Sequence, residues 1–326
     1  MTKPNKHGLL LGKFLPPHKG HLYLGDFARH FVDDLSIVVG TLPSEPIPGE
    51  LRFRWMKELF PNCKVVHLDK VLPQEPSEHP DFWKIWEHEL REIAPCLPDI
   101  VFASETYGHK LAEVLDARFI PVDPDRSIMP ISGTAVRENP FKHWDLIPPV
   151  VQSHYLKKIC VFGPESTGKS TLAKNLSLHF NTTCVPEYAR TYLEELGTDL
   201  KQEKLVDIAR GQIASTNALA SNAHQVLISD TDALLTTVWS EFLYQDCDQN
   251  IQQLADQNTH DLYLLTDVDV PWVADPVRYL PEDRSNFHAL CEDTLKRKQR
   301  NYVKLSGSWE ERFQTAVKAI EKLIQH

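Results

Sequence analysis

One segment near the middle of the sequence limits what this chain can fold into more than any other. Residues 159–172 read ICVFGPESTGKSTL, and residues 163–170 fit the pattern G-x-x-x-x-G-K-[ST] at every fixed position. A strand-like apolar run precedes the pattern, and a helix-like run, TLAKNLSLHF, follows it. A strand, a glycine-containing turn and a helix in this order are typical of a loop that binds phosphate groups.

The residues of this phosphate loop suit a nucleoside triphosphate. Its two glycines allow consecutive backbone N–H groups to converge on the phosphates, and the helix N-terminus adds partial positive charge. We expect Lys169 to reach the β- and γ-phosphates and the Ser170 hydroxyl to ligate Mg²⁺. The residues of this segment that are expected to bind ATP are Gly163, Glu165, Ser166, Thr167, Gly168, Lys169, Ser170 and Thr171.

The length and charge of the chain limit its organisation and its partners. With 326 residues the chain exceeds one typical domain, so two domains are expected. The net charge of −10 argues against a broad nucleic-acid-binding face, because such faces neutralise phosphates. The six cysteines are scattered without a C-x-x-C pair, which favours reduced thiols in a cytoplasmic protein over disulfides or a zinc site. No apolar run approaches the ~18 residues that span a bilayer, so no membrane insertion is expected.

The first half of the chain alternates strand-like and helix-like runs. Strands are expected at 8–14, 36–40, 64–68, 99–104 and 118–122, and helices at 50–60, 82–93 and 109–115. Alternation at this spacing predicts a parallel sheet covered by helices on both faces. Such sheets bind ligands at the carboxyl ends of their strands.

Two histidines follow the first of these strands. His18 and His21 are three residues apart at the start of a helix-like run, so their imidazoles are expected on one face near its positive end. This arrangement suits a polyphosphate. Alternatively the histidines are structural, or they form half of a zinc site, although no nearby Cys, Asp or Glu completes four ligands.

Two motifs of the first half form a pair. Residues 12–21, GKFLPPHKGH, match G-x-F-x-P-x-H-x-G-H, and residues 131–137, ISGTAVR, match I-S-x-T-x-x-R. Together they resemble the signatures of the nucleotidyltransferase superfamily, to which the nicotinamide mononucleotide (NMN) adenylyltransferases belong. The resemblance implies that the following residues bind ATP: Gly12, Lys13, Phe14, His18, His21, Ser132, Thr134 and Arg137.

The chemistry implied by this resemblance is an in-line attack by a mononucleotide phosphate on the α-phosphorus of ATP, with release of pyrophosphate. No side-chain nucleophile is required, because positioning and charge neutralisation carry the rate. His18, His21 and Arg137 are the expected catalytic side chains, together with Mg²⁺.

The second substrate of this reaction has weaker signals. Arg52 and Arg54 are candidates to meet its phosphate. Trp83 and Trp86 are candidates to stack on a cationic pyridine ring, and core packing is the alternative for each. The family resemblance favours Trp86.

Prolines mark a boundary between the two halves. Pro140, Pro148 and Pro149 break helices in the stretch that leads out of the first sheet. We expect the boundary near Ser153, so that residues 1–153 form the first domain and residues 154–326 the second.

Charged residues follow two strands expected in the second half. The strand at 182–187 ends on Glu187, which together with Arg190 opens a helix, and the strand at 226–230 ends on Asp230. A carboxylate at such a strand end is expected to bind Mg²⁺ with Ser170 or to accept a proton. The sequence leaves open whether Glu187 or Asp230 is the base, and a helix N-cap is the alternative for Asp230 or Asp232. The substrate contacts expected here are Glu187, Arg190, Asp230 and Asp232.

Residues 267–287 are rich in Pro, Asp and Arg and predict a lid. Arg278 and Arg284 are expected to close over the transferring phosphoryl group, as lid arginines do in nucleoside kinases. Trp272 is expected to stack on a nucleoside base. A solvated arginine and a packed tryptophan are the alternatives.

Five segments of the second half are GPESTGKS, EYAR, DTD, VPWV and NYVKLSGSWEERF. They closely resemble the ribosylnicotinamide kinase half of the bifunctional NadR proteins, which join an NMN adenylyltransferase to this kinase in the same order. The resemblance implies two parallel-sheet α/β domains, an N-terminal Rossmann-like nucleotidyltransferase and a C-terminal P-loop kinase. Some NadR members carry an N-terminal helix-turn-helix repressor domain, and because a strand is expected within ten residues of Met1, we do not expect one here.

The function implied is a two-step synthesis of NAD. The second domain would phosphorylate nicotinamide riboside with ATP, with Lys169 stabilising the γ-phosphoryl group, and the first domain would adenylylate the resulting NMN. The expected partners are small molecules, namely nicotinamide riboside, NMN, NAD and ATP, and a homo-oligomer stays open. The alternatives are a fusion acting on another nucleoside and a nucleotide-sensing regulator of NAD metabolism in which one domain binds without turnover.

Overall fold

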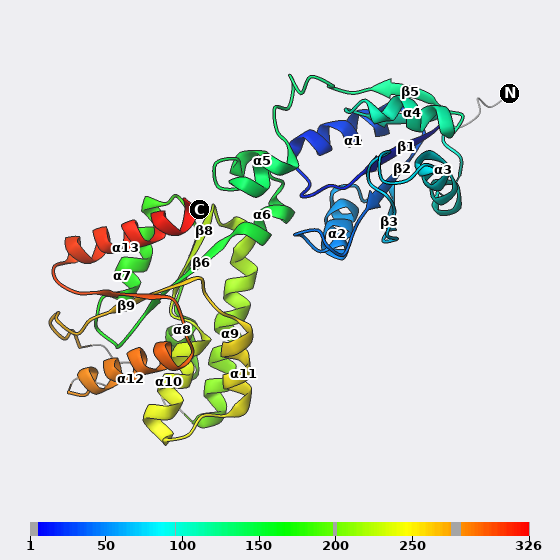
Figure 1. Ribbon diagram of the computed structural model, residues 1–326. Helices are drawn as coiled ribbons and strands as arrows, with labels where there is room; N and C mark the ends of the chain where they lie inside the picture. Colours follow the sequence, from blue (N-terminus) through cyan, green and yellow to red (C-terminus); the bar gives the residue numbers. More distant parts are fainter. Residues whose placement is uncertain (1–5, 95, 198–200, 275–281, 326) are drawn as a thin grey trace. The chain divides into compact units, whose positions relative to one another are not determined.

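The computed structural model describes residues 6–94, 96–197, 201–274 and 282–325. The chain divides into two compact units, Met1–His154 and Tyr155–His326. Each unit contains its own five-stranded parallel sheet with helices on both faces (Figure 1). The two parallel-sheet α/β domains predicted from the sequence are confirmed. No helix in the described parts of the chain is long and apolar enough to cross a membrane.

The first sheet has the strand order β3-β2-β1-β4-β5. Its strands are β1 (His7–Gly12), β2 (Asp34–Gly40), β3 (Lys64–Leu68), β4 (Ile100–Ala103) and β5 (Arg118–Pro121). In the central strand, Leu10 pairs with Ile37 of β2 and Phe102 of β4. The order of the strands reverses at β1, so the turn after β1 lies at the switch point where α/β sheets bind ligands.

Helices bury both faces of the first sheet. They are α1 (Lys19–Phe31), α2 (Gly49–Leu59), α3 (Phe82–Ile93) and α4 (Tyr107–Val114), followed by α5 (Gly133–Glu138), a 3₁₀ helix (Trp144–Leu146) and α6 (Pro149–Tyr155). Leu10 packs in a core with residues of α1 and α2, and its neighbour Leu9 packs in a second core with residues of α3 and α4. Because successive residues of a strand face opposite sides, this alternation requires an apolar layer on each face.

The second sheet has the strand order β10-β9-β6-β8-β7. Its strands are β6 (Lys157–Phe162), β7 (Cys184–Val185), β8 (Val226–Asp230), β9 (Leu262–Thr266) and β10 (Tyr302–Leu305). The central strand is β6, and it leads directly into the phosphate loop. Here too the strand order reverses at the strand that precedes the expected ligand site.

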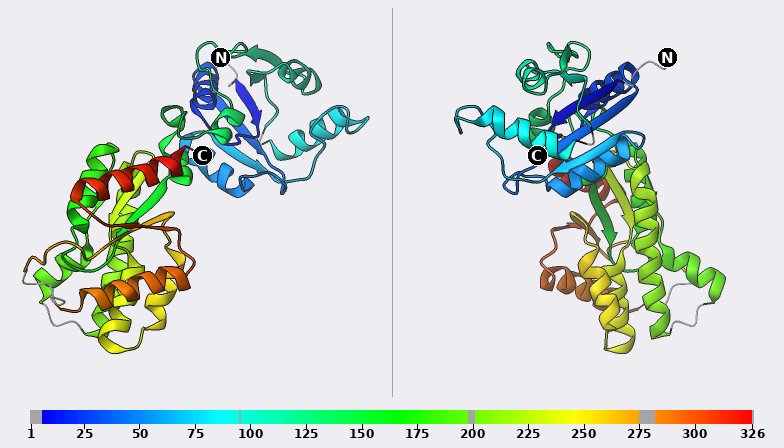
Figure 2. Two further views of the ribbon diagram at one scale, coloured as in Figure 1. Left: turned by 60° about the vertical axis from the view of Figure 1, so that its left-hand side comes forward. Right: turned by 90° about the vertical axis from the view of Figure 1, so that its right-hand side faces the viewer.

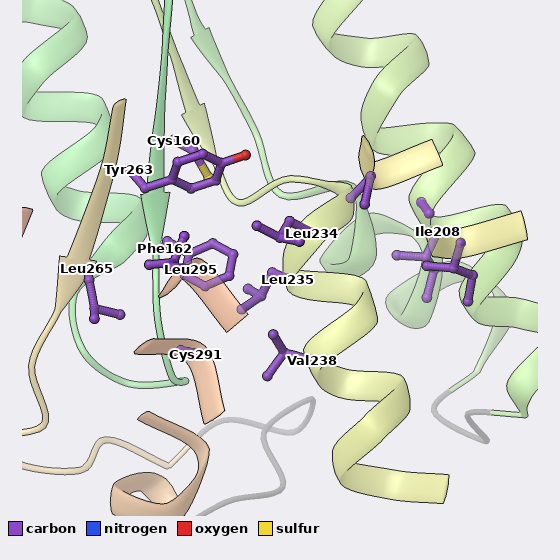
Figure 3. Close-up of a cluster of buried hydrophobic side chains, with 14 of the residues drawn as sticks. Cys160, Phe162, Ile208, Leu234, Leu235, Val238, Tyr263, Leu265, Cys291 and Leu295 are labelled. Atoms are coloured by element: carbon purple, nitrogen blue, oxygen red, sulfur yellow. The ribbon is translucent and has the colours of Figure 1, made fainter. Parts of the chain in front are cut away.

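The helices of the second unit form two layers. They are α7 (Lys169–His179), α8 (Tyr188–Leu196), α9 (Gln202–Leu219), a 3₁₀ helix (Ala220–Asn222), α10 (Ala233–Tyr244), α11 (Gln249–Gln257), α12 (Arg284–Arg297) and α13 (Trp309–Ile324). Helices α7 and α13 lie together on one face, over Ile159 and Val161 (Figure 2). On the other face Cys160 and Phe162 join a core with side chains of α9, α10 and α12 (Figure 3).

Two expected elements differ in extent. The strand expected at 182–187 is reduced to Cys184–Val185, since Pro186 has no N–H to donate to a ladder. The segment expected to form a lid, 267–287, overlaps helix α12, which begins at Arg284, and its residues 275–281 lie outside the described part of the chain. In that helix Phe287, Cys291 and Leu295 form a buried stripe at a spacing of four residues, which binds its first turn to the core.

Candidate functional site

The first candidate site lies in the turn between β1 and α1. His18 is the N-cap residue of α1, with an extended backbone, and its N–H donates to Nδ1 of His21 at 3.3 Å. The two imidazole rings are stacked with their centroids 3.7 Å apart. Phe14, whose φ of 47° lies in the left-handed region, packs its ring edge to face against His21. The helix start therefore fixes both imidazoles side by side.

Both histidines are neutral in this environment. Burial lowers the pKa of His18 to about 4, and the charge of Arg126 acts in the same direction. Burial lowers the pKa of His21 well below its ordinary value, and the charges of His18 and Arg126 act in the same direction. In the described part of the chain no hydrogen-bond partner reaches Nδ1 of His18. A buried imidazole nitrogen with no partner fits a site that receives an anionic oxygen from a ligand.

The second motif of the first unit meets the first one. A Cβ added at Gly133 would lie 2.5 Å from the carbonyl oxygen of Leu15, so glycine permits the start of α5 to pack on this turn. Arg137 donates through Nη1 to the same Leu15 oxygen, and through Nη2 to Oγ1 of Thr134 at 3.2 Å. Ser132 caps α5 by accepting the N–H of Ala135 at 3.1 Å. Two segments more than a hundred residues apart in the sequence thus contribute to the same candidate site.

Arg52 stabilises the turn between β1 and α1 by hydrogen bonds. Its side chain is fully buried and donates to the carbonyl oxygens of Ile47 at 3.1 Å and Lys13 at 2.6 Å, and to Glu45 at 2.5 Å. Glu45 also pairs with the Lys13 ammonium at 3.4 Å. Each of the three guanidinium nitrogens of Arg52 is engaged in the fold, so the structure gives this residue a supporting role in place of the phosphate contact considered for it. Arg54 is exposed.

The two tryptophans considered for the pyridine ring differ in their surroundings. Trp86 is buried, and its indole N–H donates to the carbonyl oxygen of Pro73 at 2.9 Å. A Cβ added at Gly40, the last residue of β2, would lie 3.8 Å from Cη2 of Trp86, so the ring reaches the carboxyl edge of the sheet. Trp83 is half-buried and packs edge to face on Phe82.

The second candidate site is the phosphate loop. Gly163 and Gly168 have φ values of 133° and 84°, which favour glycine, and Ser166 also has a positive φ. Two hydrogen bonds cross the loop: Oγ1 of Thr167 and Nζ of Lys169 each donate to the carbonyl oxygen of Pro164 at 2.8 Å. The lysine that is expected to bind phosphates therefore lies across the loop.

A half-buried carboxylate, Glu187, and a buried one, Asp230, lie close enough to this lysine to feel its charge. Glu187 is the N-cap residue of α8, and Asp230 ends β8. Burial raises the pKa of Glu187 to about 7, the charge of Lys169 opposes the shift, and Asp230 reinforces it. Burial also raises the pKa of Asp230. The charges of Lys169 and Arg190 and a hydrogen bond with Ser170 act in the opposite direction. Two acids with raised pKa values beside one lysine are candidates to hold or accept a proton.

Ser170 and Asp230 offer the oxygen atoms that Mg²⁺ prefers. Their side chains are hydrogen-bonded, and Oδ1 of Asp230 has no hydrogen-bond partner among the described residues. A hydroxyl and a carboxylate with a free buried oxygen, next to a phosphate loop, fit the few protein ligands that this hydrated ion takes.

Asp232 is held by the fold. Its Oδ1 accepts the N–H of Leu235 at 3.2 Å as the N-cap of α10, and its Oδ2 accepts the hydroxyl of Tyr263 at 2.8 Å. Nδ1 of His260 lies 3.3 Å from the same oxygen. The helix-cap alternative considered for Asp232 is therefore what the structure shows.

A cavity of about 150 Å³ opens beside the loop. It is lined by residues of the loop and of α8, α9 and α10, among them Glu165, Lys169, Ser170, Glu187, Arg190 and Asp232. Because charged groups stand at the loop side while Leu205, Ile208 and Trp239 complete the wall, the cavity suits a small molecule with one polar end.

The segment expected to form a lid is attached to the loop. Oγ of Ser166 accepts the N–H of Val273 at 2.7 Å, and Arg284 donates to the carbonyl oxygens of Val270 at 3.0 Å and Ser166 at 3.4 Å. The guanidinium of Arg284 lies 5.6 Å from the ring centre of Trp272. Arg278 lies outside the described residues.

Comparison with known proteins accounts for nearly the whole chain. Residues 158–312 match a family model described as an AAA domain. Over 341 aligned residues the chain is 29% identical to the trifunctional NAD biosynthesis/regulator protein NadR of Escherichia coli strain K12, which covers 97% of this chain and 83% of that protein. The chain is a NadR homologue. The resemblance identified from the sequence is confirmed.

Solved NadR structures share its fold. The crystal structure of a NadR protein in complex with NR matches with a TM-score of 0.83 and 24% identity, covering 98% of this chain and 96% of that chain. A NadR complex with NAD and AMP-PNP matches with a TM-score of 0.80 and 24% identity, over 99% and 97% of the two chains. This NadR homologue therefore has the NadR fold in both of its units.

Sequence reasoning missed two residues of this homologue's second site. Gln212 of α9 accepts the N–H of Tyr188 at 2.8 Å and donates to the carbonyl oxygen of Pro186 at 3.3 Å, and thereby fixes the backbone around Glu187. Trp239 of α10 lines the cavity and packs against Phe287, with ring centroids 4.3 Å apart. Gln212 was detectable as a polar residue on the buried stripe of a helix, whereas nothing distinguishes Trp239 in the apolar run around it.

Proposed function

We propose that this chain is a bifunctional enzyme of NAD biosynthesis. Its second unit transfers the γ-phosphoryl group of ATP to nicotinamide riboside and forms NMN. Its first unit transfers the adenylyl group of a second ATP to NMN and forms NAD and pyrophosphate. The observation that carries the proposal is the similarity to NadR over 97% of this chain, which keeps both sets of ATP signatures in two separate units.

The ligands of the solved NadR structures support the substrate classes. One of those structures holds NR, and the other holds NAD together with AMP-PNP, an ATP analogue. The cavity beside the phosphate loop has charged groups on one side and an apolar wall on the other, as a riboside with an aromatic base requires.

In the first unit the residues act by positioning. The NMN phosphate oxygen attacks the α-phosphorus of ATP, a new P–O bond forms, and the bond to the pyrophosphate leaving group breaks. His18 and His21 are neutral without ligand, and the negative triphosphate raises their proton affinity so that both become donors to its oxygens. Arg137, held on the carbonyl of Leu15, adds a fixed positive charge.

In the second unit Glu187 is the general base. It lines the cavity, and its pKa of about 7 allows it to take the 5′-hydroxyl proton of the riboside as the oxygen attacks the γ-phosphorus. Lys169 turns from Pro164 to the phosphates and neutralises the charge that spreads over them. Ser170 and Asp230 would hold Mg²⁺, which when bound neutralises charge on the β- and γ-phosphate oxygens. Arg190 lines the same cavity and contacts the substrate.

The test follows both products in one reaction. The purified chain with ATP, Mg²⁺ and nicotinamide riboside should form NMN and then NAD. Lys169→Ala should stop NMN formation from the riboside yet leave conversion of supplied NMN to NAD, and His21→Ala should do the reverse. ATP binding without either product would favour the nucleotide sensor instead, and loss of both steps in either variant would refute two independent sites.

A further inference from the structure

Trp309 is a large aromatic side chain left exposed at the edge of the phosphate loop. It is the first residue of α13, and 58% of its surface is accessible. A Cβ added at Gly168 would lie 2.4 Å from Cζ3 and 2.7 Å from Cη2 of its ring. The indole therefore lies directly against the last glycine of the loop, and more than half of its surface is open to solvent. The two-step mechanism above gives this ring no role.

A buried arginine fixes the position of the ring. Arg312 is 1% exposed, and it donates to the carbonyl oxygens of Thr167 at 3.1 Å, Gly307 at 3.1 Å and Asp267 at 3.2 Å. It also pairs with Asp269, which accepts the N–H of Gly307 at 2.6 Å. The guanidinium lies 5.4 Å from the ring centre of Trp309. The segment that carries the indole is thus tied to the phosphate loop itself.

The ring lies on the side of the loop where the donor nucleoside must be. Phosphoryl transfer is in line, so the acceptor and the leaving nucleotide lie on opposite sides of the γ-phosphorus. The acceptor cavity is built by α8, α9 and α10, which belong to the sheet face of Cys160 and Phe162. Helix α13 covers the opposite face with α7, and Trp309 is not among the residues that line the cavity. A nucleotide whose phosphates occupy the loop can therefore extend its base toward Trp309.

We propose that Trp309 is the stacking platform for the purine base of the phosphate donor ATP. The inference rests on the proposed kinase function and adds a base contact to the phosphate contacts of the loop. Arg312 is a positioning residue that holds the platform against the loop. Because stacking uses the face of the base, which every purine presents, this contact favours purine donors as a class without reading the edge of the base.

The test compares a donor that has a base with one that has none. Initial rates of ADP release with nicotinamide riboside give the KM for ATP, and inorganic tripolyphosphate as a competitor gives a Ki for the loop alone. Trp309→Ala should raise the KM for ATP by roughly 10- to 100-fold, the range expected for one lost base–aromatic stack. It should leave the Ki of tripolyphosphate unchanged. Trp309→Phe keeps a ring and should stay close to wild type.

Each outcome separates the platform from a packing role and from failure of the kinase itself. If Trp309→Ala weakens tripolyphosphate as much as ATP, the ring serves only to pack on Gly168, and the platform is wrong. An unchanged KM for ATP in an active variant would overturn it as well. Absence of ADP release by the wild-type chain would contradict the kinase function instead. Adenylyl transfer to supplied NMN is the internal control and should keep its KM for ATP.

Discussion

The proton affinity of Glu187 sets the pH at which the second unit can work. Burial holds the pKa of this carboxyl at about 7, well above that of an exposed glutamate. The base must be deprotonated, so the active fraction of free enzyme rises as pH rises through that value. We expect kcat/KM for riboside phosphorylation to increase from pH 6 to pH 8 and then level off. Stopped-time assays with product separation would measure the profile.

A matched variant distinguishes the base from its neighbour. Glu187→Gln keeps the size of the side chain and should lower kcat about 100-fold or more, the usual contribution of a general base. The residual activity should lose its rise between pH 6 and pH 8. A variant that keeps the same rise would assign the titration to another group, with Asp230 the first to test.

His18 links the stability of the first unit to pH. An unfolded histidine takes up a proton near pH 6.5, whereas burial lowers the pKa of His18 to about 4. Between these values the unfolded state binds a proton that the folded state does not, so the free energy of unfolding falls as pH falls through this window. The span corresponds to on the order of 3 kcal/mol. Urea unfolding at pH 7 and pH 4.5 would measure the change.

The control for this effect is a residue that cannot titrate. We expect His18→Asn to reduce the difference in free energy of unfolding between pH 7 and pH 4.5. This reduction should be larger than the loss of unfolding free energy that the substitution causes at pH 7. His21 keeps its own share of the dependence, because burial lowers its pKa too. Equal pH dependence in the variant and in wild type would show that His18 does not carry the loss.

At the scale of elements, one glycine sets how closely α8 approaches α9. A Cβ added at Gly211 would lie 2.0 Å from Cε1 of Tyr188, which directly follows Glu187. Gly211→Ala must therefore displace a tyrosine ring at the start of α8, at a cost of about 1–3 kcal/mol. Riboside phosphorylation should fall while adenylyl transfer continues. Asn217→Ala, at an exposed position on the same helix, is the matched control and should leave both reactions intact.

The helices and strands were largely predictable, because apolar runs and periodic apolar residues indicate them and Gly and Pro residues separate them. Apolar runs of four to seven residues identified the strands at 36–40 and 226–230, and both lie where they were expected. What the sequence could not show was which elements meet. Nothing local indicates that Gly133 contacts Leu15, or that Gly168 contacts Trp309, since each contact joins segments more than a hundred residues apart. For the same reason Arg52 was open to a phosphate role until its three hydrogen-bond partners were known.

At the scale of the whole molecule, each unit completes its own sheet. Within the described residues, the strands of one sheet pair with strands of the same unit. The cores are also separate, since each apolar cluster draws its members from a single unit. We therefore expect residues 1–154 and 155–326, produced as separate chains, to fold and to keep their own reactions. A mixture of the two should convert nicotinamide riboside to NAD.

Circular dichroism of each fragment and assays with NMN or riboside would check this expectation. If either fragment is unfolded alone and recovers on mixing, the units depend on each other for stability. Only the prolines near the boundary indicate from sequence that the two units fold independently, because independence depends on which side chains pack together.

The hydrogen bonds of Arg312 also determine the order in which the two units fold while the chain is being synthesised. Chains are made from the N-terminus, and domains tend to fold as they emerge. The first unit can complete its sheet long before residue 163 appears. The phosphate loop, once made, must wait for β9 to flank β6 and for Arg312 to tie Thr167 in place. A nascent chain thus carries a finished adenylyltransferase fold while its kinase is still unformed. Truncated products would transfer the adenylyl group of ATP to NMN and release pyrophosphate, but they would not make NMN from the riboside.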